Sequence, residues 1–349
     1  MADNHIKEAA RQLTICNACR YCEGYCAVWD AMERRTEFYK KDVDYMANLC
    51  HDCRECMYVC PFTEPHEFSL NIPKVLAEVR YDTYKENTKP SFASRAFDKS
   101  WALSLAVVFA SMLGILAIAY GNGAMPLLVQ PISGFSGIMS AAFVKYSSLF
   151  VYLFVIILWS IEGLSYWKSI GESYSSALNA RATYAALKDV FLHRFFRGGG
   201  AGCNYPGEKA SKARLLAHPL VIFGFLIALF SFLPYPNLST YIEIAYGTGC
   251  AMLFAGTAML LYMKLVSNKV PSYKRMNSLD YPFTIMLNLT GITGVAMILD
   301  IGHPFAGLIF AIHMSIIFTV FITAPYGKFV HLVFRYEALL KNRIEEQKQ

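Results

Sequence analysis

Residues 16–26 read CNACRYCEGYC, and residues 50–61 read CHDCRECMYVCP. Both stretches carry the cysteine spacing C-x2-C-x2-C-x3-C, and together they hold eight of the 10 cysteines in the chain. This two-residue spacing lets three successive thiolates bind three corners of a cubane iron–sulfur cluster. Where two such runs occur, the fourth cysteine of each typically ligates the other cluster. The two runs therefore predict two [4Fe–4S] clusters.

The crossed arrangement assigns four thiolates to each cluster. One set is Cys16, Cys19, Cys22 and Cys60, and the other is Cys50, Cys53, Cys56 and Cys26. Structural zinc is one alternative, although zinc sites usually use two separated pairs of cysteines rather than triplets. Disulfides are another alternative, but they are rare in a reducing compartment.

The composition is that of a membrane protein. Hydrophobic residues make up 55% of the 349 residues, and charged residues only 17%. Residues 1–17 are polar and lack the apolar core of a signal peptide, so we expect the cysteine-rich region to stay in the cytoplasm. The net charge of +6 comes from bases beside apolar segments. This pattern favours contact with anionic lipid and argues against nucleic acid as a partner.

Residues 1–98 are expected to form a helical head. The stretch Ala27–Leu49 has apolar residues at helical spacing and no cluster of turn residues. Asn71 is a candidate N-cap, with Pro73 in the first turn of a helix that runs to about Lys85. Strands rich in β-branched residues do not flank the cysteine runs. An all-helical ferredoxin-like domain is therefore favoured over a compact βαβ ferredoxin.

Six apolar segments follow, each near the roughly 20 residues needed to cross a bilayer. They are Trp101–Tyr120, Tyr146–Tyr166, His218–Leu233, Ile242–Val266, Phe283–Leu299 and Pro304–Ala324. The sequence thus predicts an all-α fold, with the two-cluster domain at 1–98, a six-helix transmembrane domain at 99–335 and a tail at 336–349.

Basic residues indicate the orientation of these segments. They concentrate in the loop after the second segment, in the loop after the fourth segment and in the tail, whereas the opposite loops carry almost none beyond Lys145. Because cytoplasmic loops carry an excess of lysine and arginine, the head, both basic loops and both termini are expected in the cytoplasm.

Three histidines are candidate cofactor ligands or quinone contacts. His218 begins the third segment and His331 follows the sixth, so both are expected at cytoplasmic depth, where they could hold one haem between two helices. His313 lies deeper; it could bind haem, a quinone or another helix. If one helix ran through Pro325, His313 and His331 would share a face. The remaining candidate for quinone protonation is Glu162, because a carboxyl group is costly in lipid without a role or partner.

The other histidines receive no cofactor role. His303 is interpreted as an interfacial residue. His5, His51, His66 and His193 are interpreted as ordinary solvated histidines.

The whole chain resembles the tricarballylate/citrate-utilization membrane iron–sulfur proteins (TcuB/CitB type). The resemblance rests on both cysteine runs, on PHEFSLNIPKVLAEVR at 65–80, on GGGAGCNYPGE at 198–208 and on APYGKFVHLVFR at 324–335. The glycines of the third motif are not a phosphate loop, since no Lys-Ser/Thr follows them. The membrane part is similar to the cytochrome b (gamma) subunit of respiratory nitrate reductase. That subunit has two haem-ligand histidines on its last helix, at the spacing of His313 and His331.

The resemblance implies a function. Proteins of this type take electrons from a soluble FAD-dependent dehydrogenase and pass them through the clusters and haem b to membrane quinone, in a bacterial inner membrane. Only His218 is evident as a partner on an earlier helix, so one haem is expected and a second stays open. Two other functions also stay open, a redox sensor without turnover and a quinol-oxidising subunit that works in the reverse direction.

Overall fold

The structure, a computed structural model, describes residues 2–131, 138–197, 202–233, 239–300 and 302–349. Within these ranges the chain forms helices and short turns, and the only pairing of extended backbone is an isolated bridge between Cys203 and Ser211. The predicted all-helical class is therefore confirmed. Four residues of the 198–208 motif, 198–201, lie outside the described residues.

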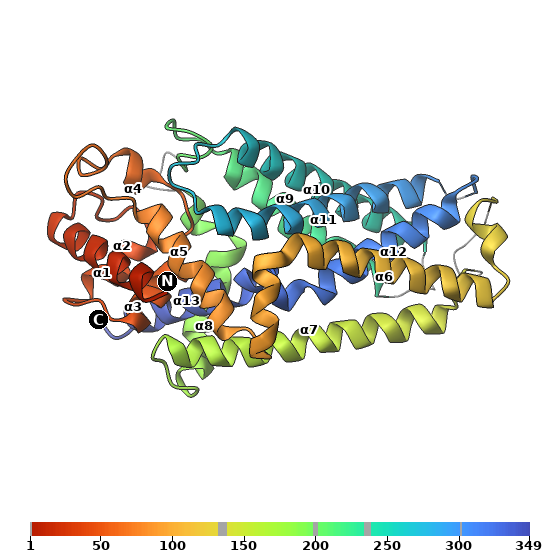
Figure 1. The fold of residues 1–349 in the computed structure, drawn as a ribbon, viewed down its shortest axis with the longest axis horizontal. Helices are drawn as coiled ribbons and strands as arrows, with labels where there is room; N and C mark the ends of the chain where they lie inside the picture. The colour runs from red at the N-terminus through yellow and green to blue at the C-terminus, as the bar shows by residue number, and fades with distance from the viewer. Residues whose placement is uncertain (1, 132–137, 198–201, 234–238, 301) are drawn as a thin grey trace.

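Five helices, α1 to α5, form the part of the head that lies near the N-terminus (Figure 1). They are α1 (Ala2–Cys19), α2 (Ala27–Glu33), α3 (Lys40–Leu49), α4 (Glu55–Tyr58) and α5 (Ile72–Asn87). The predicted cap of α5 is confirmed, because the Asn71 side chain accepts a hydrogen bond from the backbone N–H of Lys74 at 3.2 Å. Such a cap satisfies one of the backbone donors that a helix start leaves unpaired.

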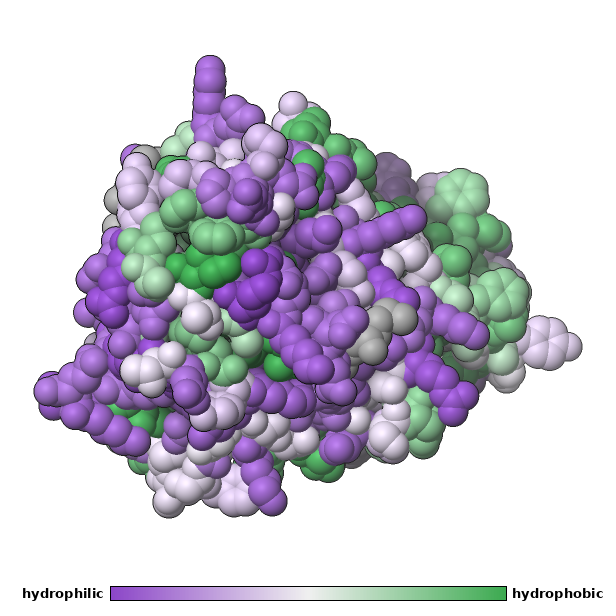
Figure 2. All heavy atoms as spheres, turned by 60° about the vertical axis from the view of Figure 1, so that its left-hand side comes forward, coloured by the Kyte–Doolittle hydropathy of each residue, from purple (hydrophilic) through white to green (hydrophobic). Residues whose placement is uncertain are grey.

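Each predicted apolar segment falls on a helix. These helices are α6 (Ser100–Gly121), which continues a 3-10 turn at Ser91–Lys99, α7 (Ala141–Ser169), α9 (Ala213–Phe232), α10 (Thr240–Val266), α11 (Lys274–Leu299) and α12 (Ala306–Ile322). In the described residues, five are long and apolar enough to cross a membrane, and α12 is a shorter apolar helix. Large apolar side chains on them face outward, including Phe109, Phe150 and Phe230. By contrast, hydrophilic side chains cover most of the face of the head in Figure 2.

Two further helices lie at the head end of the membrane helices (Figure 1). They are α8 (Ala180–Phe191) and α13 (His331–Glu346), and α13 contains most of the predicted tail. Phe334 of α13 is fully buried and stacks on Tyr166 of α7, with ring centroids 4.6 Å apart. Because α13 shares one apolar core with the head helices, the C-terminal segment joins the head to the membrane helices.

The chain does not continue as one helix from His313 to His331. Helix α12 ends at Ile322, and two short 3-10 turns precede α13. Pro325 lies in the first of these turns; proline lacks the N–H and its ring clashes with the preceding turn of an α-helix. The shared face expected for a continuous helix is therefore absent, and the two histidines belong to different helices.

Helices α9 and α10 pack closely because they meet at glycines. A Cβ atom on Gly224 of α9 would stand 2.6 Å from the backbone nitrogen of Leu253, and one on Gly249 of α10 would stand 2.6 Å from that of Ala228. Small residues allow such close backbone approach between membrane helices. This contact fixes α9, the helix that carries His218.

Candidate metal and cofactor sites

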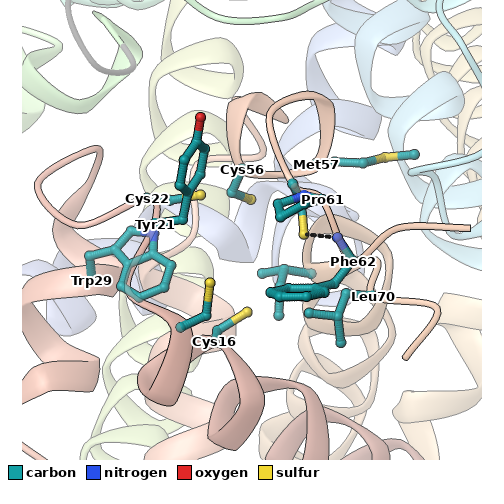
Figure 3. Close-up of a pocket in the computed structure, with 12 residues that line it drawn as sticks. Cys16, Tyr21, Cys22, Trp29, Cys56, Met57, Pro61, Phe62 and Leu70 are labelled. Carbon is teal, nitrogen blue, oxygen red and sulfur yellow. Dashed lines mark hydrogen bonds between the residues drawn. The ribbon is translucent and has the colours of Figure 1, made fainter. Parts of the chain in front are cut away.

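Four cysteines of the first predicted set line one pocket in the head. They are Cys16, Cys19, Cys22 and Cys60. In Figure 3, Cys22 and Trp29 lie on one side of the pocket, and Phe62 and Leu70 on the other. Burial, together with the neighbouring Cys60, Cys22 and Cys19 thiols, raises the pKa of Cys16 to about 12. The sulfurs surround a small apolar space, which suits a cluster held by four thiolates.

The second predicted set is also grouped in space. Burial raises the pKa of Cys26 to about 12, with Cys50 as the next cause. Burial likewise raises the pKa of Cys53 well above its usual value, and Cys26 and Cys50 add to this. Burial also raises the pKa of Cys56 well above its usual value, and Cys53, Cys26 and Cys50 add to this. Cys56 lines the first pocket as well. The fold thus brings the fourth cysteine of each run to the other run.

Three arginines fasten the loop of the second run to the head helix α5, to α13 and to the membrane helix α9. Arg80 of α5 and Arg335 of α13 each donate to the carbonyl oxygen of Cys50 at 2.7 Å. Arg214 of α9 donates to the carbonyl oxygen of Asp52 at 2.7 Å. All three arginines line the same cavity, so the cysteine loop forms part of its wall.

This cavity has a volume of about 670 Å³. Its polar end holds His218 of α9 and His331 of α13, and its apolar part lies between α7 and α9, where it is lined by Ile156, Trp159 and Phe225 among others. Ligand sites typically have volumes of roughly 300–1,000 Å³ and combine apolar walls with a few polar groups. The cavity therefore has the size and chemistry of a site for a large, mostly apolar cofactor.

Positive charge dominates the polar end. The basic side chains there are Arg54, Arg80, Arg214, Lys264, Lys328 and Arg335, and the acidic ones are Asp52 and Asp280. Burial and the nearby bases together lower the pKa of Lys328 to about 8 and that of Arg335 to about 10, although Asp280 opposes the shift at Lys328. Among the described residues, Arg335 Nε and Trp159 Nε1 are buried without a hydrogen-bond partner. Uncompensated buried cations are unfavourable, so this end suits an anionic group such as a carboxylate.

His331 has a defined tautomer. Its Nδ1 lies 2.6 Å from the backbone carbonyl oxygen of Lys328, and because a carbonyl only accepts, Nδ1 carries the proton. Burial and the neighbouring Lys328 and Arg335 lower the pKa of His331 to about 3, so the ring is neutral. Nε2 is therefore unprotonated. Metal-bound histidines usually donate their other ring N–H in this way.

His218 contacts a histidine that the sequence analysis treated as solvated. His193 is buried, 3% exposed, and its Nε2 lies 3.0 Å from His218 Nδ1. That interpretation was wrong, as it was for His51, which is buried against Phe195 and Phe196. No signal in the sequence marked His193, because its partner lies on another helix 25 residues away.

His313 is engaged between three helices. Its Nε2 lies 2.5 Å from the Tyr246 hydroxyl of α10, and its Nδ1 lies 2.8 Å from the Thr293 hydroxyl of α11. Thr293 itself donates to the carbonyl oxygen of Leu289. Nδ1–H of His313 therefore donates to Thr293, and Tyr246 donates to Nε2. Both ring nitrogens are occupied by an interhelical hydrogen-bond network, one of the three roles expected for this residue.

Glu162 of α7 lies apart from the cavity lining, fully buried at the junction with the head. One carboxylate oxygen accepts the backbone N–H of Lys89 at 3.2 Å, and the other has no hydrogen-bond partner in the described part of the chain. Glu337 of α13, whose other carboxylate oxygen faces Gly163 of α7, also has one buried oxygen without a hydrogen-bond partner in this part of the structure.

Comparison with known proteins places these sites in a family. Residues 9–86 match the sequence model of the citrate utilization protein B Fer4-like domain, and residues 105–349 match that of citrate utilization protein B. The chain belongs to the citrate utilization protein B family. Citrate utilization protein B of Escherichia coli is 33% identical over 358 aligned positions, which cover 98% of this chain and 93% of that protein.

The family assignment confirms the resemblance seen in the sequence. The Fer4-like match includes both cysteine runs, and the second match includes His218 and His331. No solved structure matches the chain. The family supports a membrane protein with an iron–sulfur electron-transfer role, and the details of that role follow from the sites themselves.

Proposed function

We propose that this protein passes electrons from a reduced soluble FAD-dependent dehydrogenase, acting on tricarballylate or a citrate-related substrate, through two [4Fe–4S] clusters and haem b to membrane quinone. The crossed cysteine sets would hold the clusters, and His218 and His331 would hold the haem iron. The bound groups supply one-electron redox chemistry at these positions.

The observation that carries this proposal is the cavity shared by His218 and His331. The two histidines come from different helices, and the bases beside them suit the carboxylates of a haem. The apolar walls suit its macrocycle. Trp159 Nε1 and Arg335 Nε, both unpaired, provide hydrogen-bond donors within the cavity.

Aromatic contacts support a short route between the second cysteine run and this cavity. His51, which follows Cys50, lies 5.5 Å from Phe196, and Phe196 lies 4.7 Å from His218, measured between ring centroids. The second cluster would therefore be the one next to the haem. The first, whose Cys19 is exposed, would accept electrons from the partner.

The distribution of basic loops supports a head on the cytoplasmic side of a bacterial inner membrane, with both termini in the cytoplasm. Quinone reduction also requires protons. Glu162 supports this step as a buried carboxyl group with an unpaired oxygen. His313 is assigned the interhelical role, because both its ring nitrogens are already bonded.

The test is the content of non-haem iron, acid-labile sulfide and haem per purified chain, with about eight irons and one haem expected from two cubanes and one bis-histidine site. His218→Ala and His331→Ala should each abolish the absorption bands of a low-spin b haem, while the content of non-haem iron stays unchanged. Unchanged bands in both variants would refute the haem assignment. Quinol formation from a chemically reduced protein would distinguish turnover from a sensor, and redox titration would give the direction of flow.

A further inference from the structure

His193 occupies an unusual place for a histidine. It lies two residues beyond the end of α8 with a φ of +52°, a left-handed conformation that is uncommon for a non-glycine residue. Its ring is buried against Phe196 and reaches back to α9. Such strained positions persist only where the surroundings hold them, and they cluster at functional sites.

The hydrogen bonds of His193 determine where its proton lies. Nδ1 is 3.0 Å from the carbonyl oxygen of Phe191, which can only accept, so Nδ1 carries the proton of the neutral ring. Nε2 of His193 is then a bare acceptor. It lies 3.0 Å from Nδ1 of His218, which must therefore be the donor.

This chain of donors leaves one nitrogen available on His218. With its proton on Nδ1, its Nε2 carries a free lone pair. His331 reaches the same state by donating from Nδ1 to the carbonyl oxygen of Lys328. The two histidines on the cavity thus share one tautomer, but one is set by a backbone carbonyl and the other by a second imidazole.

We propose that His193 is a positioning residue for the haem iron: it accepts a hydrogen bond from Nδ1–H of His218 and so keeps His218 Nε2 free and oriented for the metal. This inference rests on the proposed function. An acceptor at Nδ1 increases the electron donation of the imidazole, which stabilises the ferric over the ferrous state. His193 therefore also lowers the potential of the site.

The test uses the full-length, cluster-containing protein prepared without haem and titrated with haemin. His193→Phe keeps an aromatic ring against Phe196 but removes the acceptor, whereas His193→Gln offers a carbonyl oxygen in its place. His303→Phe is the matched control, because it removes an exposed imidazole between α11 and α12, away from the cavity. Each variant is followed by haem affinity, midpoint potential and the low-spin electron paramagnetic resonance signal.

His193→Phe is expected to weaken haem binding about 10–100-fold, the usual effect of losing a hydrogen-bond partner of a metal ligand. Its midpoint potential should rise, while His193→Gln should restore most of the affinity and the lower potential. Equal losses in the two variants would indicate a packing role, and no change in His193→Phe would exclude any role; either result overturns the inference. The proposed function fails separately, if wild-type haem binding is absent or insensitive to His218→Ala.

Discussion

Arg335 donates a hydrogen bond to the carbonyl oxygen of Cys50 at 2.7 Å, across a sequence separation of 285 residues. This bond joins the last helix to the loop of the second cysteine run, and the Arg335 side chain also lines the cavity that holds His218 and His331. One guanidinium group therefore links the two candidate redox sites.

Arg335→Ala should change the second cluster more than the first. The loss of a charged hydrogen bond typically costs about 1.5–3 kcal/mol, and here it would loosen the backbone around Cys50. We expect a shifted midpoint potential and a weaker reduced signal for the second cluster by electron paramagnetic resonance. Arg343→Ala is the matched control. Arg343 lies on α13, as Arg335 does, but it forms an ion pair with Asp189 of α8. Identical cluster signals in Arg335→Ala and wild type would contradict the link.

Paired cysteine substitutions test the crossed ligand sets. If Cys60 belongs with Cys16, the double variant Cys16→Ser/Cys60→Ser should lose one cluster, about half of the non-haem iron. Cys50→Ser/Cys60→Ser should lose both clusters. If each run held its own cluster, these two outcomes would be exchanged. Cys250→Ala, in α10, is the control and should keep all the iron.

The local features of this fold could be predicted from the sequence. The cysteine spacing, the Asn71 cap and the apolar segments each depend on residues a few positions apart, and the structure contains the corresponding helices. The position of the fourth cysteine of each run could also be predicted, because in paired runs of this spacing that cysteine typically ligates the cluster of the other run.

The features that depend on distant contacts could not be predicted. Nothing near Cys50 in the sequence indicates that its carbonyl oxygen binds Arg80 and Arg335. The role of His193 depends on how α8 ends against α9. The interruption of the helix between His313 and His331 also depends on tertiary packing, since a proline can either kink a membrane helix or end it.

His313→Leu should leave the haem spectrum unchanged and lower thermal stability. Its ring forms hydrogen bonds with Tyr246 and Thr293, so the substitution removes the hydrogen bonds that join α12 to α10 and α11 at this position. A double-mutant cycle with Tyr246→Phe should give a coupling of about 0.6–1.7 kcal/mol, the range for hydrogen bonds between membrane helices. Loss of the b-haem bands in His313→Leu would instead make this residue a haem ligand.

Glu337→Gln should stabilise the protein at alkaline pH. Burial raises the pKa of Glu337 to about 9, so the folded protein holds a proton that the unfolded chain has released. Stability therefore falls as pH rises from about 4.5 to 9, and glutamine removes this dependence. Even a stabilisation of about 1 kcal/mol would raise Tm by about 1–2 °C in a chain of this length. The variant and wild type should have similar Tm values at pH 4.5 and differ at pH 9. A constant difference at both values would exclude titration as the cause.

Haem binding should depend little on pH between 5.5 and 8. An exposed imidazole is protonated near pH 6.5 and then no longer binds iron. His331, by contrast, has its pKa lowered to about 3, so it stays neutral throughout this range. The lowered pKa of His331 also destabilises the haem-free fold at acidic pH. As pH falls, the unfolded chain binds a proton at this histidine before the folded protein does, so stability is lost between about pH 6.5 and 3.

The measurement is a haemin titration of the haem-free protein at pH 8, 6.5 and 5.5, with non-haem iron assayed at each pH to verify that the head stays intact. If His331 were solvated, affinity would fall about tenfold for each pH unit below 6.5, because each unit lowers the fraction of neutral ring tenfold. A fall of that size would show that the site is open to water before haem binds. A constant affinity would show that the buried, cationic end of the cavity keeps His331 ready for the metal.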